Sequence, residues 1–430
     1  MDKFAELSIQ DFRAIKNANI TLNGITVVAG INGCGKSTMS KLLYYIFRNV
    51  NSFEEIASDY IKQSIEPYQD ALSSIMRIVA SYSNFNYHRY MTRREGLNGY
   101  NNESLSKYID FLKSLKASIA EFHTNEKDGN SRISERDLFI IKSILGLSDK
   151  ENMDVVSMIE KFIVKITENR DKYNQLIIDR PYHLLTQRME DFFETDVLKN
   201  VSLKEYESSV YGYGVKSVPE LHYIKKVAYI DTPMVIGQHI SALQPMYWKE
   251  LNELAKMPPR KGYKLSINRH IKQNIMNGDA SFDDDLFAGG FKYYRADGKI
   301  FDLADCATGI KSFSILQMLL KNLFLGEKTL VILDEPETHL HPQWIVEYAN
   351  LIVLLHKRVG VKFFITSHST DMVSAIRYIS EKNKCLNNVS FYLAEKAGKE
   401  SYSYKYLKND IDPIFDSFNK SYDKLDEYAR

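Results

Sequence analysis

The stretch from Gly30 to Thr38, GINGCGKST, holds the residues with the clearest chemistry. It satisfies the pattern G-x-x-x-x-G-K-[ST]. Glycines let backbone N–H groups converge on phosphate oxygens, and the helix that follows adds the positive end of its dipole. We therefore predict a phosphate cradle in which Lys36 contacts the β- and γ-phosphates and the Ser37 hydroxyl ligates Mg²⁺. The residues expected to line it are Gly30, Asn32, Gly33, Cys34, Gly35, Lys36, Ser37 and Thr38.

A second candidate is LVILDEP, at Leu330 to Pro336, where four apolar residues lead into two acids. A buried strand with this ending would carry the acids to the edge of the sheet beside the phosphate loop. Asp334 is then expected to hold Mg²⁺, and Glu335 to polarise the attacking water. The alternative is a pair of solvated acids after a strand, and the glycine loop favours the catalytic interpretation.

A third candidate is His368, which ends the apolar run FFITSHS. Its position after a second buried strand predicts a contact with the γ-phosphate. His339 and His341, in ETHLHPQW, have no third matched ligand, so a turn-and-packing role is favoured over a metal site.

The elements around these residues alternate between strands and helices. AELSIQDF, ANITL and ITVVAG read as strands, and KSTMSKLLYYIF reads as a helix directly after the glycine loop. Strand patterns return at KKVAYIDTP, at TLVILDEP and at VKFFITSHS, with a hairpin expected at Ala296-Asp297-Gly298. This order predicts an α/β fold whose parallel strands end at the active edge.

Residues 51–205 differ, because amphipathic helical patterns replace the strands there. SLSKYIDFLKSLKASIAEF and VVSMIEKFIVKI each place their apolar residues on one face. The predicted organisation is a head in two parts, 1–50 and 206–400, interrupted by a helical insertion, 51–205, and followed by a tail, 401–430.

Composition is that of an ordinary globular protein. The 430 residues are 44% hydrophobic and 26% charged, with a net charge of +1. The three cysteines are widely spaced and fit neither a disulfide framework nor a CxxC zinc pattern. With no apolar run of membrane-spanning length and no signal peptide, a cytoplasmic protein without membrane partners is expected.

Three stretches together, FRAIKNANITLNGITVVAGINGCGKST, LVILDEPETHLHPQW and FFITSHSTDM, resemble the ABC-type head of the RecF, SMC and OLD-family ATPases. The resemblance covers about the first fifty and the last two hundred residues, but not the insertion. It implies an ABC-type P-loop NTPase head with N-terminal antiparallel strands, and ATP and Mg²⁺ as cofactors. It also implies slow, dimerisation-dependent hydrolysis of ATP. Lys36, Ser37, Asp334, Glu335 and His368 match the family's phosphate, Mg²⁺, base and switch positions.

The family also implies a head-to-tail homodimer, in which a signature loop of one chain completes the ATP site of the other. This loop departs from the usual L-S-G-G-Q or L-S-S-G, because the chain reads CATGIKSF. Gly309 fits the signature glycine and Ala307 replaces the usual serine. Thr308 would supply the missing hydroxyl, and Lys311 would add charge. Gln238 is a candidate for the family's Q-loop glutamine.

The form DEPE-x-HLHP is typical of OLD-like ATPases of bacterial phage-defence operons. OLD nucleases continue into a Toprim domain, and the sixty residues or so after His368 are expected to be too short for one. The resemblance thus implies a sensor or scaffold subunit, similar to the PtuA and AriA ATPases of the Septu and PARIS systems. A separate nuclease or toxin would be its effector, and DNA or a phage protein its trigger.

Two basic clusters favour a second function, a RecF/SMC-like repair ATPase that binds DNA directly. A solvated surface is an equally good interpretation of both clusters, given the balanced net charge. A transporter ATPase is disfavoured by the insertion and the divergent signature. The basic residues are Arg89, Arg93 and Arg94 in the first cluster and Arg260, Lys261, Lys264, Arg269 and Lys272 in the second.

Overall fold

The computed structural model describes residues 3–80, 99–125, 154–237, 241, 243–285 and 289–418. They divide into two compact units, one made of residues 1–51 and 189–430 and the other of residues 52–188. We call the first unit the head and the second the helical unit. Arg89, Arg93, Arg94 and Gln238 lie outside the described residues, and so do residues 419–430.

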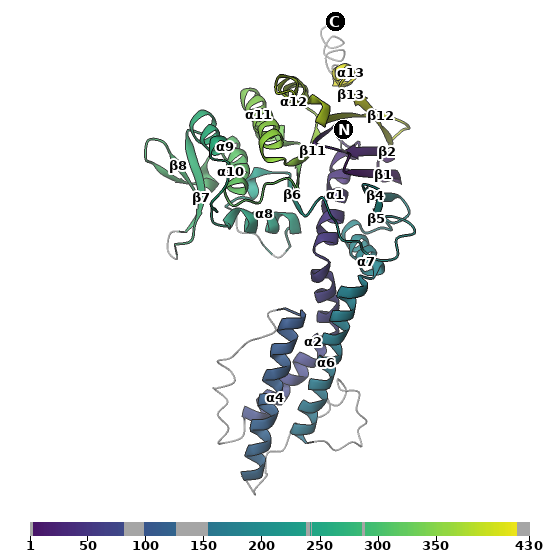
Figure 1. The fold of residues 1–430 in the computed structure, drawn as a ribbon, viewed down its shortest axis with the longest axis vertical. Coiled ribbons are helices and arrows are strands. Elements are labelled where there is room, and N and C mark those ends of the chain that lie inside the picture. The colour runs from purple at the N-terminus through teal and green to yellow at the C-terminus, as the bar shows by residue number, and fades with distance from the viewer. Residues whose placement is uncertain are drawn as a thin grey trace. The chain divides into compact units, whose positions relative to one another are not determined.

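One sheet of ten strands organises the described part of the head, in the order β5-β4-β1-β2-β13-β12-β3-β11-β10-β6 (Figure 1). Its strands are β1 (Ala5–Phe12), β2 (Ile15–Leu22), β3 (Ile25–Ala29), β4 (Val201–Glu205), β5 (Ser208–Tyr211), β6 (Lys226–Ile230), β10 (Thr329–Asp334), β11 (Lys362–Ser367), β12 (Val389–Lys396) and β13 (Tyr402–Lys408). β12, β3, β11, β10 and β6 pair in parallel, whereas β1 pairs antiparallel with both β2 and β4.

The burial patterns of the strands explain why the sheet has a parallel part and an antiparallel part. β3 and β10 are buried along their whole length, as expected of parallel strands that are covered on both faces. β1 shows partial alternation of buried and exposed residues, the pattern of an antiparallel strand with one solvated face. The predicted α/β fold, with N-terminal antiparallel strands and a large helical insertion, is confirmed.

Helices and a smaller sheet complete the head. Its helices are α1 (Lys36–Asn51), α8 (Met246–Lys256), α9 (Leu265–His270), α10 (Thr308–Lys321), α11 (Pro342–Val359), α12 (Thr370–Lys382) and α13 (Asp412–Phe418), and α7 (Tyr182–Phe193) crosses the boundary between the units. The short helical turns are η1 (Pro233–Val235), η2 (Ile271–Ile275), η3 (Leu303–Asp305), η4 (Pro336–His339) and η5 (Leu386–Asn388). The small sheet is β7 (Gly278–Asp283), β8 (Gly290–Arg295) and β9 (Ile300–Asp302).

The predicted hairpin at Ala296 to Gly298 is confirmed. It joins β8 to β9, with Gly298 at φ 85° and its N–H donated to the Arg295 carbonyl at 3.0 Å. Gly360 ends α11 in the left-handed conformation, which favours glycine at the end of a helix.

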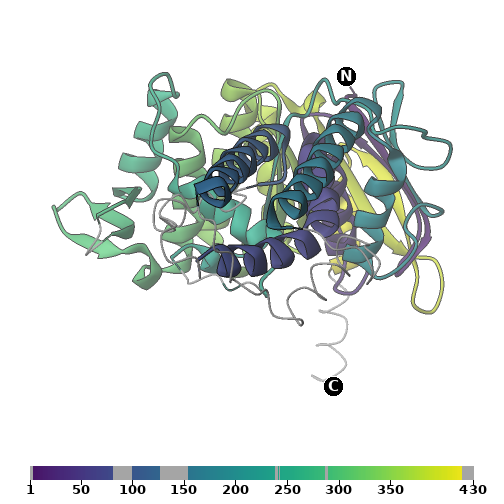
Figure 2. The same ribbon diagram turned by 90° about the horizontal axis from the view of Figure 1, so that it is seen from below.

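The helical unit contains α2 (Phe53–Ala80), α4 (Asn102–Asn125) and α6 (Val155–Asp179). α6 lies beside both α2 and α4 (Figures 1 and 2). The stripe predicted on α4 is buried, because Leu105, Leu112 and Ile119 are each fully covered. Among the described residues, no helix is long and apolar enough to cross a membrane.

The boundaries of these parts differ from the sequence-based ones in two places. The insertion ends at Arg188 rather than at residue 205, because Phe192 and Phe193 at the end of α7 pack against Tyr45 and β4 pairs with β1. The segment assigned to a tail contains β13, which lies in the sheet between β2 and β12. Both segments therefore belong to the head.

Candidate functional site

The glycine loop links β3 to α1 at the carboxyl edge of the parallel strands. Gly33 and Gly35 have φ values of 80° and 99°, a region that favours glycine. A Cβ on Gly35 would lie 2.6 Å from Ile15 Cγ1, so this position also lacks room for a side chain. The Gly30 N–H is donated to the Ser367 carbonyl at 3.3 Å, which ties the loop to the end of β11.

Lys36 is buried under this loop, with 3% of its surface exposed. Its Nζ donates to the carbonyls of Gly30 at 2.8 Å and Ile31 at 3.0 Å, and forms an ion pair with Glu335 Oε1 at 3.1 Å. Its ammonium therefore joins the loop to the acid that follows β10. These contacts hold a cation at the centre of the site.

The other cradle residues differ in what they can offer a ligand. Asn32, Gly33 and Ser37 are exposed, and Thr38 is partly exposed. Cys34 is buried, and its carbonyl accepts a hydrogen bond from the Tyr404 hydroxyl at 2.8 Å. Cys34 is thus part of the packing, and only its backbone is available to a phosphate.

Asp334 lies at the end of β10 and is held by its two neighbouring strands. Its Oδ2 accepts a hydrogen bond from the Tyr229 hydroxyl of β6 at 2.6 Å, and its Oδ1 accepts one from Thr366 of β11. Burial and the charge of Asp334 raise the pKa of the Tyr229 hydroxyl, so this group stays protonated and can donate. The two bonds fix the carboxylate in one orientation at the sheet edge.

Glu335 turns away from the strand direction, since it adopts the left-handed conformation with φ 52° and ψ 54°. Its N–H is donated to the Thr366 carbonyl at 3.0 Å. This turn directs its carboxylate to two cationic or titratable groups: Oε1 faces Lys36, and Oε2 lies 3.4 Å from His368 Nδ1. A non-glycine residue in this conformation is uncommon and is typical of functional sites.

His368 follows β11, with 40% of its side chain exposed. Its N–H is donated to Glu337 Oε1 at 2.8 Å, and its ring Nδ1 lies 3.4 Å from that same oxygen. The predicted residues Lys36, Asp334, Glu335 and His368 are thus brought together at one edge of the sheet. Parallel pairing explains why, since Asp334 is in register with Thr366 on β11.

Glu337 is a site residue that the sequence interpretation did not assign a role. It is 6% exposed, and its Oε1 accepts hydrogen bonds from the Ser367 hydroxyl and the His368 N–H, both at 2.8 Å. Its Oε2 is buried, and no described residue forms a hydrogen bond with it. Burial raises the pKa of its carboxyl above the ordinary value of 4.5. Its place in DEPETHLHP, three residues after Asp334, is the signal that could have identified it.

We expect Glu337→Leu to destabilise the protein by about 2 kcal/mol, because the Ser367 and His368 donors lose their acceptor. Glu337→Gln keeps an acceptor oxygen and should cost less than about 1 kcal/mol. Urea unfolding of the full chain measures both. Equal losses for the two variants would contradict the role of this acceptor.

The raised pKa of Glu337 also predicts that the stability of the protein depends on pH. A carboxyl whose pKa is raised by folding adds stability below its unfolded pKa, and that stability is lost as the pH rises through the folded pKa. The wild type should therefore lose stability relative to Glu337→Gln as the pH rises from 4.5 toward neutrality.

We call residues 307–309, in the predicted signature loop CATGIKSF, the signature turn. It leads into α10, which contacts α8, α9 and η1 in another part of the head. Figure 1 shows α8, α9 and α10 together. Gly309 faces Trp344 of α11 so closely that a Cβ would lie 2.0 Å from the ring. Lys311 is 5% exposed, and its Nζ donates to the Ala304 carbonyl at 2.5 Å. The Lys311 ammonium is thus bonded within its own chain, and the charge that it would add at a phosphate remains a prediction.

Ala307 is the N-cap of α10, and its side chain makes no capping hydrogen bond. Ala307→Ser should stabilise the protein by about 1 kcal/mol, because a serine Oγ can accept from the first turn of the helix. Thermal or urea unfolding measures the gain, with Ala307→Val as a control that lacks the acceptor. Equal stabilities for the two variants would contradict this explanation.

Of the two histidines in ETHLHPQW, His341 can be placed, whereas the side chain of His339 lies outside the described part of the structure. His341 is the N-cap of α11, and its Nδ1 accepts from the Gln343 N–H at 3.4 Å. Within the described ranges, no group of three or more His, Cys, Asp or Glu has the arrangement of a metal site. A Mg²⁺ site made of Ser37 and Asp334 would accordingly draw further oxygen ligands from phosphate and water, which suits a hard cation that keeps several waters.

Residues 3–373 match the model of the AAA ATPase domain family. Endonuclease GajA of Bacillus cereus (strain HuB5-5) is a curated relative that is 21% identical over 476 residues, covering 94% of this chain. The chain spans 62% of the length of that relative. The SMC head domain of Thermotoga maritima is similar at 8% identity and a TM-score of 0.37, covering 94% of this chain and 99% of that one. The Smc head of Pyrococcus furiosus bound to the C-terminal domain of ScpA matches at 10% identity and a TM-score of 0.35, covering 100% of both chains.

Proposed function

The chain belongs to the AAA ATPase domain family, and we propose that this ATPase is a sensor or scaffold subunit of a bacterial anti-phage defence complex. It would control a separate effector, a nuclease or a toxin. The observation that carries the ATPase part is the gathering of Lys36, Asp334, Glu335 and His368 at one sheet edge. The defence part is supported by the OLD-like DEPETHLHP and by the similarity to a protein named as an endonuclease.

In this proposal each residue has one task. Lys36 exchanges its contacts with the loop carbonyls for the β- and γ-phosphate oxygens of ATP. Ser37 and Asp334 would hold Mg²⁺, which would supply positive charge to neutralise the phosphates. Glu335 accepts the proton of the attacking water, and His368 donates a hydrogen bond to the γ-phosphate. Glu337 positions His368 through the bond to its backbone N–H.

A second copy of the chain completes the site. Thr308 and Gly309 begin α10, and the positive end of a helix dipole favours a phosphate group there. We therefore place the signature turn of one copy against the γ-phosphate bound by the other, in a closed dimer that hydrolyses ATP slowly.

Purification of the chain, expressed together with its genomic neighbours, tests the defence part. A nuclease or toxin that copurifies in a fixed ratio, and whose activity changes with ATP, is the expected result. Recovery of DNA with no protein partner would count against this function.

The alternative, direct DNA binding of the RecF/SMC type, is favoured by exposed basic residues around α9. Arg260, Lys261, Lys264, Arg269 and Lys272 are all exposed, although Lys272 pairs with Asp279 at 3.5 Å. If they contact DNA phosphates, affinity for duplex DNA should fall with salt. The slope of log K against log salt is negative. The double variant R260E/K264E should make it shallower by about 2, since each lost phosphate contact removes about 0.9 from its magnitude. Filter binding at several salt concentrations measures the slope for the wild type and the variant. An unchanged slope would exclude these residues as the DNA-binding surface.

A further inference from the structure

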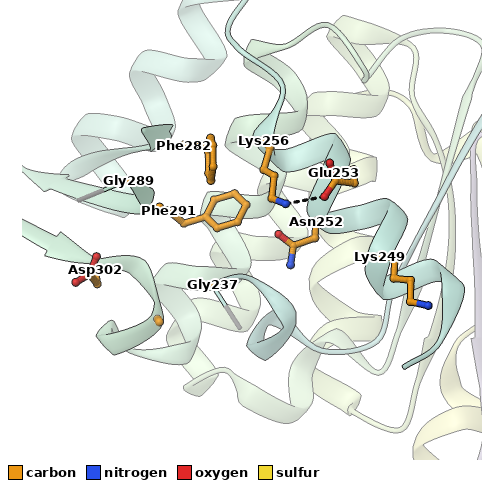
Figure 3. A pocket seen from close by; sticks show the side chains of 11 residues that line it. Gly237, Lys249, Asn252, Glu253, Lys256, Phe282, Gly289, Phe291 and Asp302 are labelled. Carbon is orange, nitrogen blue, oxygen red and sulfur yellow. Dashed lines mark hydrogen bonds and ion pairs between the residues drawn. The ribbon is translucent and has the colours of Figure 1, made fainter. Parts of the chain in front are cut away.

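A cavity of about 690 Å³ lies in the head, outside the residues assigned to ATP hydrolysis. α8, β7, β8 and the turn η3 form its walls (Figure 3). Its volume falls within the range of about 300–1,000 Å³ that is usual for small-molecule sites. The residues that matter for its chemistry are Asn252, Glu253, Lys256, Phe282, Phe291 and Ala304.

Asn252 supplies a buried acceptor to this cavity. Its side chain is 4% exposed, and its Nδ2 donates to the Val235 carbonyl at 3.2 Å, which fixes the orientation of the amide. Its Oδ1 is buried and has no hydrogen-bond partner among the described residues, and Figure 3 shows this oxygen on the side of Phe291. A buried acceptor left unpaired is destabilising, so a ligand that donates an N–H here would relieve that cost.

Two aromatic rings line one side of the cavity. Phe282 and Phe291 meet edge to face, with ring centroids 5.0 Å apart. Phe282 is half-buried and therefore has ring surface left for a further contact. A planar ring can stack there, as nucleobases do on aromatic side chains.

Three of the four charged side chains that line the cavity, Glu253, Lys256 and Asp302, form ion pairs within the chain. Lys256 pairs with Glu253 at 2.6 Å, and Asp302 pairs with Lys292 at 2.5 Å. The cavity therefore suits an uncharged ring better than a bare anion. A ring that stacks and also carries an N–H donor at its edge satisfies both the phenylalanines and Asn252.

We propose that this cavity binds a nucleobase that carries an amino group, such as adenine or cytosine. The base stacks on Phe282, with Phe291 edge to face beside that ring, and its amino group donates to Asn252 Oδ1. The base is presented either by a free nucleoside or nucleotide, or by single-stranded nucleic acid, since the chemistry at the ring is the same.

The cavity is connected to the signature turn. Ala304 lines the cavity, and its carbonyl accepts the Lys311 Nζ from the first turn of α10, where Thr308 and Gly309 lie. Gly237 also lines it and lies so close to Ala304 that a Cβ there would be 3.1 Å from Ala304 Cβ. A bound base would therefore restrain η3 and, through Lys311, the signature turn. This regulatory consequence rests on the proposed function, whereas binding of the base does not.

Binding is measured on the full chain carrying Lys36→Ala, so that the ATP centre contributes little. The probes are adenosine, cytidine and thymidine in calorimetric titrations, and single strands of twelve deoxyadenosines or twelve deoxycytidines in fluorescence titrations. Asn252→Leu and Phe282→Leu, each added to Lys36→Ala, remove the acceptor and the aromatic face. Asn274→Leu, at an exposed asparagine outside the cavity, is the matched control.

Adenosine or cytidine, or their homopolymers, should bind at least about tenfold more tightly than after either cavity substitution, a difference of about 1.4 kcal/mol. Binding of the nucleosides alone identifies a small-molecule site, and binding of the strands identifies a nucleic-acid site. Absence of binding for every probe, or binding that neither substitution weakens, would overturn the proposal. Because ATP turnover is not the readout, failure of the ATPase assignment would leave this result intact.

Discussion

A Glu335→Gln variant is expected to bind ATP with near wild-type affinity and to hydrolyse it about 10²–10⁴ times more slowly. The expected loss of hydrolysis follows from the position of the Glu335 carboxylate. Glu335 is the acid that the left-handed turn after β10 directs toward both Lys36 and His368, so it is the group placed to take a proton from water. Glutamine keeps the size and one acceptor oxygen of the side chain but is not a base.

Steady-state phosphate release and equilibrium ATP binding, measured on the same preparation, test this expectation. Glu395→Gln is the matched control, because Glu395 is exposed on β12 and pairs with Lys405 at 3.5 Å. Hydrolysis by Glu335→Gln at the wild-type rate would show that another group is the base. Loss of ATP binding in this variant would assign Glu335 to binding instead.

The second large effect is expected from Lys36→Ala, which should weaken ATP binding by about a hundredfold and reduce turnover as well. Truncating one partner of a buried, hydrogen-bonded charge pair costs about 2–5 kcal/mol. Lys36 makes one such ion pair, with Glu335, and two hydrogen bonds to loop carbonyls, so its loss would leave Glu335 without its cation. The substitution should therefore weaken phosphate binding and also displace the base, Glu335.

Titration with a fluorescent ATP analogue measures this loss, and Lys396→Ala, at an exposed lysine, is the control. Unfolding by urea separates the loss of binding from the loss of folding, because Lys36 is buried. Wild-type affinity for the ATP analogue in folded Lys36→Ala protein would contradict the assignment of residues 30–38 as a phosphate-binding loop.

Much of this site can be predicted from the sequence because its signals are local. A strand, a glycine loop and a helix follow one another within Ile25–Asn51, and the two acids follow a continuous apolar run. Such patterns depend on neighbouring residues in the chain. The chemistry of Lys36, Asp334 and Glu335 could therefore be inferred without knowing the fold.

The residues that hold the acids could not be predicted in this way, because they come from distant strands. Tyr229 is 105 residues from Asp334, and Ser367 is 30 residues from Glu337. Only the order β11-β10-β6 brings them together. Nothing in the local pattern of VAYID distinguishes a tyrosine that binds an acid from one that fills the core.

The boundaries and the signature turn also depend on tertiary contacts. α7 is helical like the insertion before it, and the packing of Phe192 and Phe193 on Tyr45 assigns its end to the head. Lys311 looks like an available charge in the sequence, but the carbonyl of Ala304 takes its ammonium. These features are set by partners that a single sequence does not reveal.

The central claim is that two copies of the chain share each ATP site, and a mixing experiment tests it most directly. Lys36→Ala disables one side of the site, and Thr308→Glu places a negative charge on the other. Each variant alone should be inactive in ATP hydrolysis. An equimolar mixture should recover about a quarter of the wild-type rate, because half of the randomly formed dimers carry one intact site of two. A mixture as inactive as its components, or a Thr308→Glu chain as active as wild type, would contradict a shared site.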